Sequence, residues 1–129
     1  MAEAIKSFRE LRVYQSAMDT AMEIFAMSKK FPSEEKYSLT DQMIRASRSV
    51  CANMGEAWRK RRYKAAFISK LSDSETEAGE MQVHLEVAMR CTYISEKNFQ
   101  EFFNKYEIII SQIITMIDGA DKWTIKQNK

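Results

Sequence analysis

The sequence predicts an all-α protein, an up-down-up-down antiparallel four-helix bundle, from three observations. The chain of 129 residues contains only three glycines and one proline, whereas a turn-dense β fold uses many more of both. Hydrophobic residues recur every three or four positions in four long stretches, which is the period of an α-helix. The connections between these stretches are short, and short connections join antiparallel neighbours. Residues 1–129 therefore form one domain that can bury a hydrophobic core.

The first helix is expected over residues 7–30 and the second over residues 34–61. Pro32 ends the first helix, because a proline pushes the residue before it out of the α region. Ser33 is then expected to cap the second helix, which has two carboxylates in its first turn. The other helices are expected to pack around the hydrophobic stripe of this second helix. That stripe comprises Leu39, Met43, Ala46, Val50, Met54 and Ala57.

The third helix is expected over residues 64–91 and the fourth over residues 96–123. Ser95 stands where an N-cap of the fourth helix would stand. The inner stripe of the third helix comprises Phe67, Leu71, Ala78, Met81, Leu85 and Ala88. The tail, residues 124–129, is polar and is expected to fray.

The fourth helix carries hydrophobic side chains on more than one face. They are Ile108, Ile109, Ile110, Ile113, Ile114, Met116 and Ile117. A helix in a lone bundle needs a hydrophobic stripe about 100° wide to face the core. The hydrophobic stripe of the fourth helix is wider than this. Either the helix is unusually central or its second face meets another subunit. Because every helix of a small bundle is peripheral, we favour the second explanation and expect a homo-oligomer.

Composition indicates a cytoplasmic protein. The formal net charge is +2, the apolar runs are too short to cross a bilayer, and charges stand in the N-terminal stretch where a signal peptide would be apolar. Cys51 and Cys91 both fall inside helical patterns. We expect two buried, reduced thiols, with a disulfide as the less favoured alternative.

A polar stripe accompanies the hydrophobic stripe of the second helix. Its members, at steps of three and four, are Gln42, Arg45, Ser49, Asn53 and Glu56. Arg45 and Glu56 are too far apart along the axis to meet, so each is expected to pair with another helix. Glu80 of the third helix is expected to pack inward toward Arg45. The stripe is interpreted as a packing or subunit-interface network, with a ligand-binding groove or a solvated face as alternatives.

A basic cluster ends the second helix. It comprises Arg59, Lys60, Arg61, Arg62 and Lys64. In the predicted topology this turn lies at the same end as both chain termini. That end therefore also gathers Lys6, Arg9, Arg12, Lys122, Lys126 and Lys129. Such a patch could bind phosphates of RNA or DNA, with affinity falling steeply with salt, or it could be a solvated helix end. Trp58 and Tyr63 flank the cluster and could either stack on bases or anchor the end of the bundle.

Metal binding and catalysis are disfavoured. The acidic residues that begin the third helix (Asp73, Glu75, Glu77) lead to His84, which is the only histidine. A di-iron bundle needs a Glu-x-x-His pair from each of two helices, so no metal or other cofactor is expected. The chain also lacks a glycine-rich phosphate loop and a GxSxG elbow. The sequence therefore predicts a protein that is not an enzyme.

Several stretches together resemble a known family. The first runs Phe8-x-x-Leu11-x-Val13-Tyr14-Gln15-x-Ala17, followed by Phe31-Pro32-x-x-Glu35 and Ser38-Leu39-x-x-Gln42. The most specific is Arg45-Ala46-x-x-Ser49-Val50-x-x-Asn53-Met54-Gly55-Glu56-Ala57. With Leu85-Glu86-Val87-Ala88 in the third helix, they make residues 8–123 similar to the 23S rRNA intervening-sequence protein family. This chain has Gly55 and Ala57 where the family usually has alanine and glycine.

The resemblance implies a bacterial four-helix bundle that assembles into a ring-like homopentamer, with no established enzymatic activity. A related bundle is an accessory protein of a reverse transcriptase and binds nucleic acid. That relative supplies only the idea, and the basic cluster of this chain leads us to expect that it binds RNA or DNA through its basic end. The alternative is a protein–protein interaction scaffold whose basic end docks an acidic partner.

Overall fold

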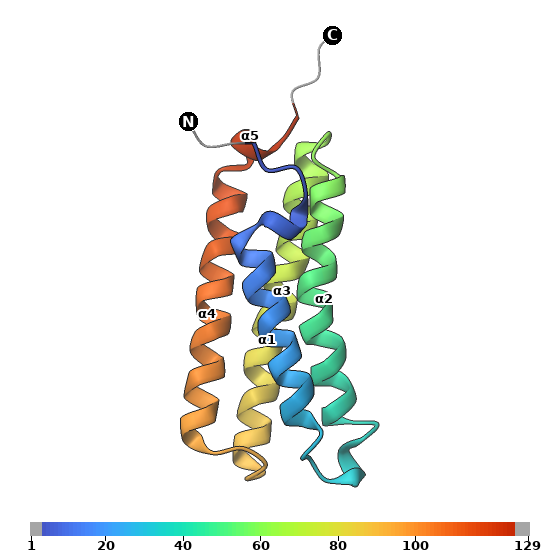
Figure 1. Cartoon of the computed structure of the whole chain (residues 1–129), viewed down its shortest axis with the longest axis vertical. Helices are drawn as coiled ribbons and strands as arrows, with labels where there is room; N and C mark the ends of the chain where they lie inside the picture. Colours follow the sequence, from blue (N-terminus) through green and yellow to red (C-terminus); the bar gives the residue numbers. More distant parts are fainter. Residues whose placement is uncertain (1–3, 126–129) are drawn as a thin grey trace.

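Four long helices stand side by side and alternate in direction in the computed structural model, which describes residues 4–125 (Figure 1). They are α1 (Arg12–Ser28), α2 (Leu39–Arg59), α3 (Lys64–Arg90) and α4 (Glu96–Asp118). Each helix packs against its two neighbours in the order α1, α2, α3, α4 and back to α1. No strand occurs between residues 4 and 125. The predicted up-down-up-down bundle is therefore confirmed.

The first predicted helix is divided in two. A short 3-10 helix, η1 (Phe8–Glu10), is separated from α1 by extended backbone at Leu11. Ser7 caps η1, and its own backbone N–H donates to the Glu10 carboxylate at 2.9 Å. A helix therefore starts near Ser7, as expected, with its first backbone N–H groups bonded by this reciprocal cap. The helix continues for only one turn. Leu11 then places its side chain in the core, so α1 starts later than predicted.

The second predicted helix also starts later, at Leu39 in place of residue 34. Residues Ser33–Glu35 form the 3-10 helix η2, and Ser33 does not act as a cap. Glu35 holds this segment against two other elements. One of its carboxylate oxygens accepts the Leu39 N–H at 3.3 Å, and the other accepts the Tyr93 hydroxyl at 2.8 Å. Glu35, and not Ser33, therefore bonds to the start of α2, so the predicted Ser33 cap is wrong.

The second half of the chain follows the prediction more closely. The α3 helix starts at residue 64, and Ser95 caps α4 by accepting the Asn98 N–H at 3.0 Å. Between these helices Thr92 has a φ of 62°, which reverses the chain. The fourth helix ends earlier than predicted, at Asp118, and Gly119 separates it from the short α5 (Ala120–Trp123).

The predicted hydrophobic stripes of α2 and α3 are all buried. Cys51 is buried among them, and this burial raises the pKa of its thiol to about 11. Cys91 lies just beyond α3 and is exposed, so the expectation of two buried thiols is wrong for Cys91. Both cysteines are free. The difference arises because α3 ends one residue before Cys91.

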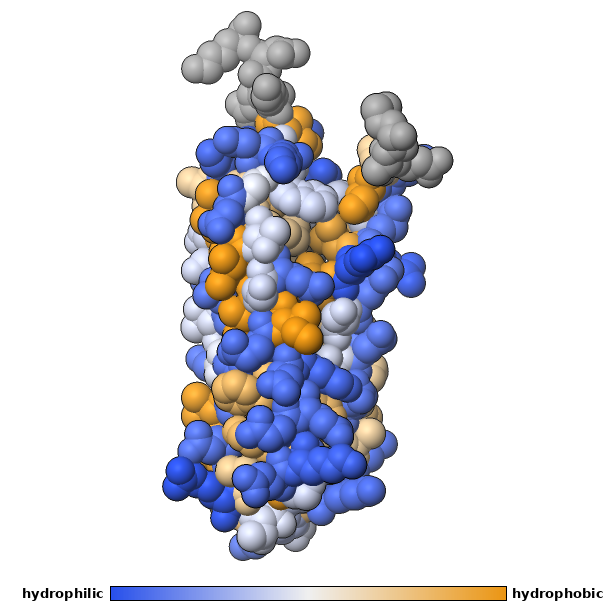
Figure 2. Space-filling view, turned by 90° about the vertical axis from the view of Figure 1, so that its left-hand side faces the viewer, coloured by the Kyte–Doolittle hydropathy of each residue, from blue (hydrophilic) through white to orange (hydrophobic). Residues whose placement is uncertain are grey.

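Hydrophobic side chains also reach the surface of α4. Ile108 is 59% exposed and Ile114 is 40% exposed. Figure 2 views the molecule from the side of α4 and shows hydrophobic residues gathered over the upper half of this face.

Within residues 4–125, no helix combines the length and the hydropathy that a membrane span requires.

Candidate nucleic-acid interface

The turn between α2 and α3 lies beside the beginning and the end of the described chain (Figure 1). The Ile125 N–H donates to the Arg61 carbonyl at 2.8 Å. Lys64 Nζ lies 2.7 Å from Asp121 Oδ1, which joins the start of α3 to α5. The predicted meeting of these segments is confirmed. We call this region, which contains η1, the turn at residues 60–63 and α5, the basic end.

Two cations of the predicted cluster hold the basic end together. The Arg61 guanidinium stacks 3.5 Å from the centroid of the Trp58 ring, and its Nε donates to the Trp58 carbonyl at 2.8 Å. Partial burial lowers the pKa of Arg61, and the neighbouring charge of Arg59 lowers it further. Lys64 is engaged by Asp121. Arg61 and Lys64 therefore stabilise the fold at this end.

Other cations of the cluster extend into solvent. Arg59 and Lys60 are exposed, and neither forms a hydrogen bond or an ion pair with any side chain of residues 4–125. Arg62 is exposed as well. Further exposed cations at the basic end are Lys6, Arg9, Arg12 and Lys122. Lys126 and Lys129, which the sequence also assigns to this end, lie outside the described residues.

The two aromatic residues beside the cluster differ. Trp58 is only 5% exposed, and its ring lies edge-on to the ring of Trp123 with a centroid distance of 6.4 Å. It therefore anchors the end of the bundle and cannot stack on a base. Tyr63 is 62% exposed and is accessible from solvent.

The polar stripe of α2 forms separate local contacts in place of one network. Arg45 pairs with Asp41 of its own helix at 2.9 Å, so the expected pairing with another helix is wrong. Gln42 is exposed. Asn53 donates to the Ser49 carbonyl at 3.0 Å and to its hydroxyl at 3.2 Å. These contacts lie along one helix, because residues four positions apart are neighbours on its surface.

Within residues 4–125, Glu56 is the one member of the stripe that bonds to a neighbouring helix. The Glu56 carboxylate lies 3.0 Å from Lys70 Nζ of α3. Glu80 is exposed and does not pack inward toward Arg45, so that expectation is wrong. Glu80 instead lies beside Glu77 on α3, and partial burial together with this neighbour raises the pKa of Glu77. The register of α2 against α3 places Lys70, which the sequence analysis did not single out, opposite Glu56.

A groove that the sequence analysis missed lies between the start of α1 and the second half of α2. Its volume is about 800 Å³. Its lining includes the aromatic residues Phe8 and Tyr14 and the cations Arg48, Arg59, Lys60 and Lys70. The sequence carries a signal for it, since Arg48, Ala52, Gly55 and Arg59 follow at steps of four, three and four. Two small residues between two arginines on one helix face leave room for a groove.

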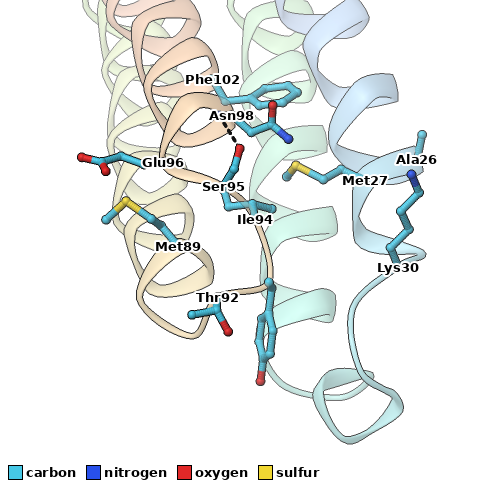
Figure 3. A pocket seen from close by; sticks show the side chains of 11 residues that line it. Ala26, Met27, Lys30, Met89, Thr92, Ile94, Ser95, Glu96, Asn98 and Phe102 are labelled. Carbon is cyan, nitrogen blue, oxygen red and sulfur yellow. Dashed lines mark hydrogen bonds between the residues drawn. The ribbon is translucent and has the colours of Figure 1, made fainter.

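The opposite end of the bundle also contains a cavity, of about 970 Å³. It lies between α1 and the connection from α3 to α4 (Figure 3). Lys30 and Glu96 both line it, so the charges of its two ionic side chains cancel.

Within residues 4–125, no three His, Cys, Asp or Glu side chains are grouped as metal ligands would be. Burial lowers the pKa of His84, an effect that the neighbouring Glu80 opposes.

A family model for the 23S rRNA-intervening sequence protein matches residues 9–115. The chain belongs to this family. The match covers all four long helices except the last residues of α4, so the resemblance drawn from the helix motifs is confirmed.

A solved structure has the same fold. It is the crystal structure of a protein of unknown function from the S23 ribosomal protein family of Bacteroides thetaiotaomicron VPI-5482. The two proteins are 28% identical, with a TM-score of 0.74, over 82% of this chain and 95% of the other. No curated protein matches the chain. The comparisons therefore establish the family and the four-helix bundle.

Proposed function

We propose that this member of the 23S rRNA-intervening sequence protein family is a non-enzymatic homo-oligomer that binds RNA or DNA through its basic end. The observation that carries the proposal is the exposure of Arg59 and Lys60, which extend into solvent without an ion-pair partner among residues 4–125. Phosphates are the ligands that such a group of exposed cations favours, because binding them releases condensed counterions.

Two carboxylates of the basic end support the proposal because they are already engaged. Glu10 accepts the backbone N–H groups of Lys6 and Ser7 at 3.0 and 2.9 Å. Asp121 pairs with Lys64. These contacts reduce the ability of either carboxylate to neutralise Arg59 or Lys60. The basic end therefore presents an excess of positive charge even though the formal net charge of the chain is only +2.

Charges of both signs are mixed at the opposite end, so the excess of positive charge lies at one end of the bundle axis. Exposed lysines there alternate with carboxylates in the connection between α1 and α2 and at the start of α4. A polyanion approaching the molecule is therefore attracted to one end. No motif that reads base edges accompanies the cations, so binding is expected to be weakly dependent on sequence.

Assembly would strengthen this attraction by repeating the basic end. The exposed hydrophobic side chains Ile108 and Ile114 support a contact between subunits through α4, since such side chains lose contact with water when a second subunit covers them. Five copies in a ring, as the family resemblance implies, would place several basic ends within reach of one nucleic acid. Each copy would add counterion release to the same binding event.

Paired charge variants test the proposal. In Arg59→Ala/Lys60→Ala the two side chains without partners are removed, whereas Lys29→Ala/Lys30→Ala removes the same charge from the opposite end. We expect the first variant to reduce the slope of log affinity against log salt by about 1.4 for a single-stranded probe, at about 0.7 per lost phosphate contact. The second variant should retain the wild-type slope. Equal effects of both variants would contradict a site at the basic end.

A further inference from the structure

An exposed tyrosine stands in the turn that joins α2 to α3, at the basic end (Figure 1). Tyr63 is 62% exposed, and its side chain forms no hydrogen bond, ring contact or cation–π contact within residues 4–125. Its backbone is nevertheless held. The Tyr63 N–H donates to the Lys60 carbonyl at 3.0 Å, and the Tyr63 carbonyl accepts the N–H of the buried Phe67 at 2.9 Å. The fold therefore presents an uncovered aromatic ring from a fixed backbone position.

Three of the other tyrosines have a role in the fold. The ring of Tyr14 packs edge-to-face on the ring of Phe8 with a centroid distance of 4.9 Å. Tyr93 donates its hydroxyl hydrogen to Glu35 at 2.8 Å, and Tyr106 is buried in the core. Tyr63 differs from these three because its ring is neither buried nor bonded within residues 4–125, so the ring is accessible to a ligand.

Tyr37 is also exposed, but it lies at the opposite end of the bundle and has different surroundings. It is 85% exposed, and Lys36 Nζ lies 5.3 Å from the centroid of its ring. Glu34 and Glu35 stand three and two positions before it. A strand whose base stacked on Tyr37 would bring its phosphates near these carboxylates, and like charges repel. Exposure of a tyrosine is therefore combined with uniformly positive surroundings only at the basic end of the described chain.

The chain around Tyr63 carries cations and no carboxylate. Between residues 57 and 72 the sequence contains no aspartate or glutamate. Arg62 directly precedes Tyr63 and is exposed, and the exposed Arg59 and Lys60 stand at the end of α2. Proteins that bind single-stranded nucleic acid combine these two features, because the aromatic ring stacks on a base while the cations bind the backbone.

We propose that Tyr63 stacks on an unpaired base of a single-stranded RNA or DNA, while Arg59 and Lys60 bind the adjacent phosphates. This inference rests on the proposed function and adds the class of nucleic acid. A duplex keeps its bases stacked on one another, so along its length it offers phosphates to the cations but no base face to Tyr63. The basic end thus selects single strands through the face of the base, which every base possesses.

Binding of four labelled probes of equal length to the full chain tests the inference. The probes are oligouridylate, oligothymidylate, an abasic sugar-phosphate strand and a DNA duplex. We expect the two single strands with bases to bind about tenfold more tightly than the abasic strand, which has the same backbone charge but nothing to stack. The tighter of these two strands identifies whether the stacked base belongs to RNA or to DNA.

Substitution of Tyr63 locates the effect. Tyr63→Ala should lower the affinity for both single strands to that for the abasic strand, and it should leave the affinities for the abasic strand and the duplex unchanged. Tyr63→Phe should retain the wild-type affinities, because stacking requires the ring and not the hydroxyl. The matched control is Tyr37→Ala, which removes an exposed tyrosine from the opposite end and should change none of the four affinities. An unchanged urea midpoint of Tyr63→Ala verifies that this variant is folded.

The outcomes separate this inference from the proposed function. Equal affinities of the wild-type chain for single strands and the abasic strand would overturn the inference while leaving polyanion binding at the basic end intact. Retained discrimination in Tyr63→Ala, or an equal loss in Tyr37→Ala, would overturn the assignment to Tyr63. Failure of the wild-type chain to bind any of the four probes, even at low salt, would overturn the inference and the proposed function together.

Discussion

The Arg61 guanidinium lies 3.5 Å from the centroid of the Trp58 ring and donates to the carbonyl of the same residue. Arg61 belongs to the basic cluster by sequence, yet this contact gives it a structural role. Its guanidinium covers the ring that closes the core at the basic end. The cations of one cluster therefore divide into some that stabilise the bundle and others that are available to a ligand.

Arg61→Ala should lower the free energy of unfolding by about 1–2 kcal/mol, because it removes a cation–π contact and a hydrogen bond. Arg59→Ala, which removes an exposed cation without a partner, should change it by less than about 0.5 kcal/mol. Urea denaturation followed by circular dichroism measures both. Equal stability of the two variants would contradict the structural role of Arg61.

Ser74 connects α3 to α2, because its buried hydroxyl donates to the Val50 carbonyl at 2.7 Å. Ser74→Ala should reduce the free energy of unfolding by about 1 kcal/mol, the net value of one such bond. The matched control is Thr76→Val, which removes an exposed hydroxyl that bonds only within α3. The same denaturation experiment reports both changes, and a neutral Ser74→Ala would be inconsistent with this contact.

The two cysteines should react with a thiol reagent at very different rates. The thiolate is the reactive form, and burial raises the pKa of Cys51 to about 11, whereas Cys91 is exposed. One thiol per chain should therefore react rapidly near neutral pH, and the second only in denaturant. Mass spectrometry of the labelled chain identifies the site. Rapid labelling of native Cys51 would contradict its burial beside the groove between α1 and α2.

The raised pKa of Cys51 also predicts a pH dependence of stability. The unfolded thiol ionises near its ordinary pKa of 9.0, while the folded thiol stays protonated up to about 11. The contribution of Cys51 is thus fully present below pH 9.0 and is lost as the pH rises toward 11. Cys51→Ala should lack this contribution, while those of Tyr93 and Tyr106, whose pKa values are also raised, remain in both proteins. The difference between the urea midpoints of the two proteins, measured across this range, tests the sign.

Ile114→Lys should reduce the mass of the assembled protein, because it places a charge on the exposed hydrophobic face of α4. The control is Met22→Lys, which adds the same charge at an exposed hydrophobic residue of α1. Light scattering coupled to size-exclusion chromatography measures the mass. A wild-type chain that elutes as a monomer would contradict the proposed assembly. An Ile114→Lys variant with unchanged oligomer mass would exclude Ile114 from the interface.

The helical period was sufficient to predict the bundle. Phe67, Leu71 and Leu85 recur on one face of α3, and burying that face determines the neighbours of the helix. The starts of α1 and α2 could not be predicted in this way. They depend on long-range contacts, such as the bond from Tyr93 to Glu35, which joins residues that are distant in sequence.

The candidate site was only partly predictable for the same reason. Topology alone placed the turn at residues 60–63 beside both chain ends, and the structure agrees for the two ends of the described part, residues 4–125. Charge alone could not distinguish Arg61 from Arg59, because the difference depends on the orientation of each side chain relative to Trp58. The groove required the position of Phe8 against Gly55, which depends on the break between η1 and α1.

The most direct test of the central claim is the salt dependence of nucleic-acid binding by the wild-type chain. Affinity for a labelled single strand would be measured from low to near-physiological salt. We predict a linear fall of log affinity with log salt and a slope of about −2 or steeper, corresponding to at least three phosphate contacts. Absence of binding at low salt would contradict the account and would favour an acidic protein as the partner of the basic end.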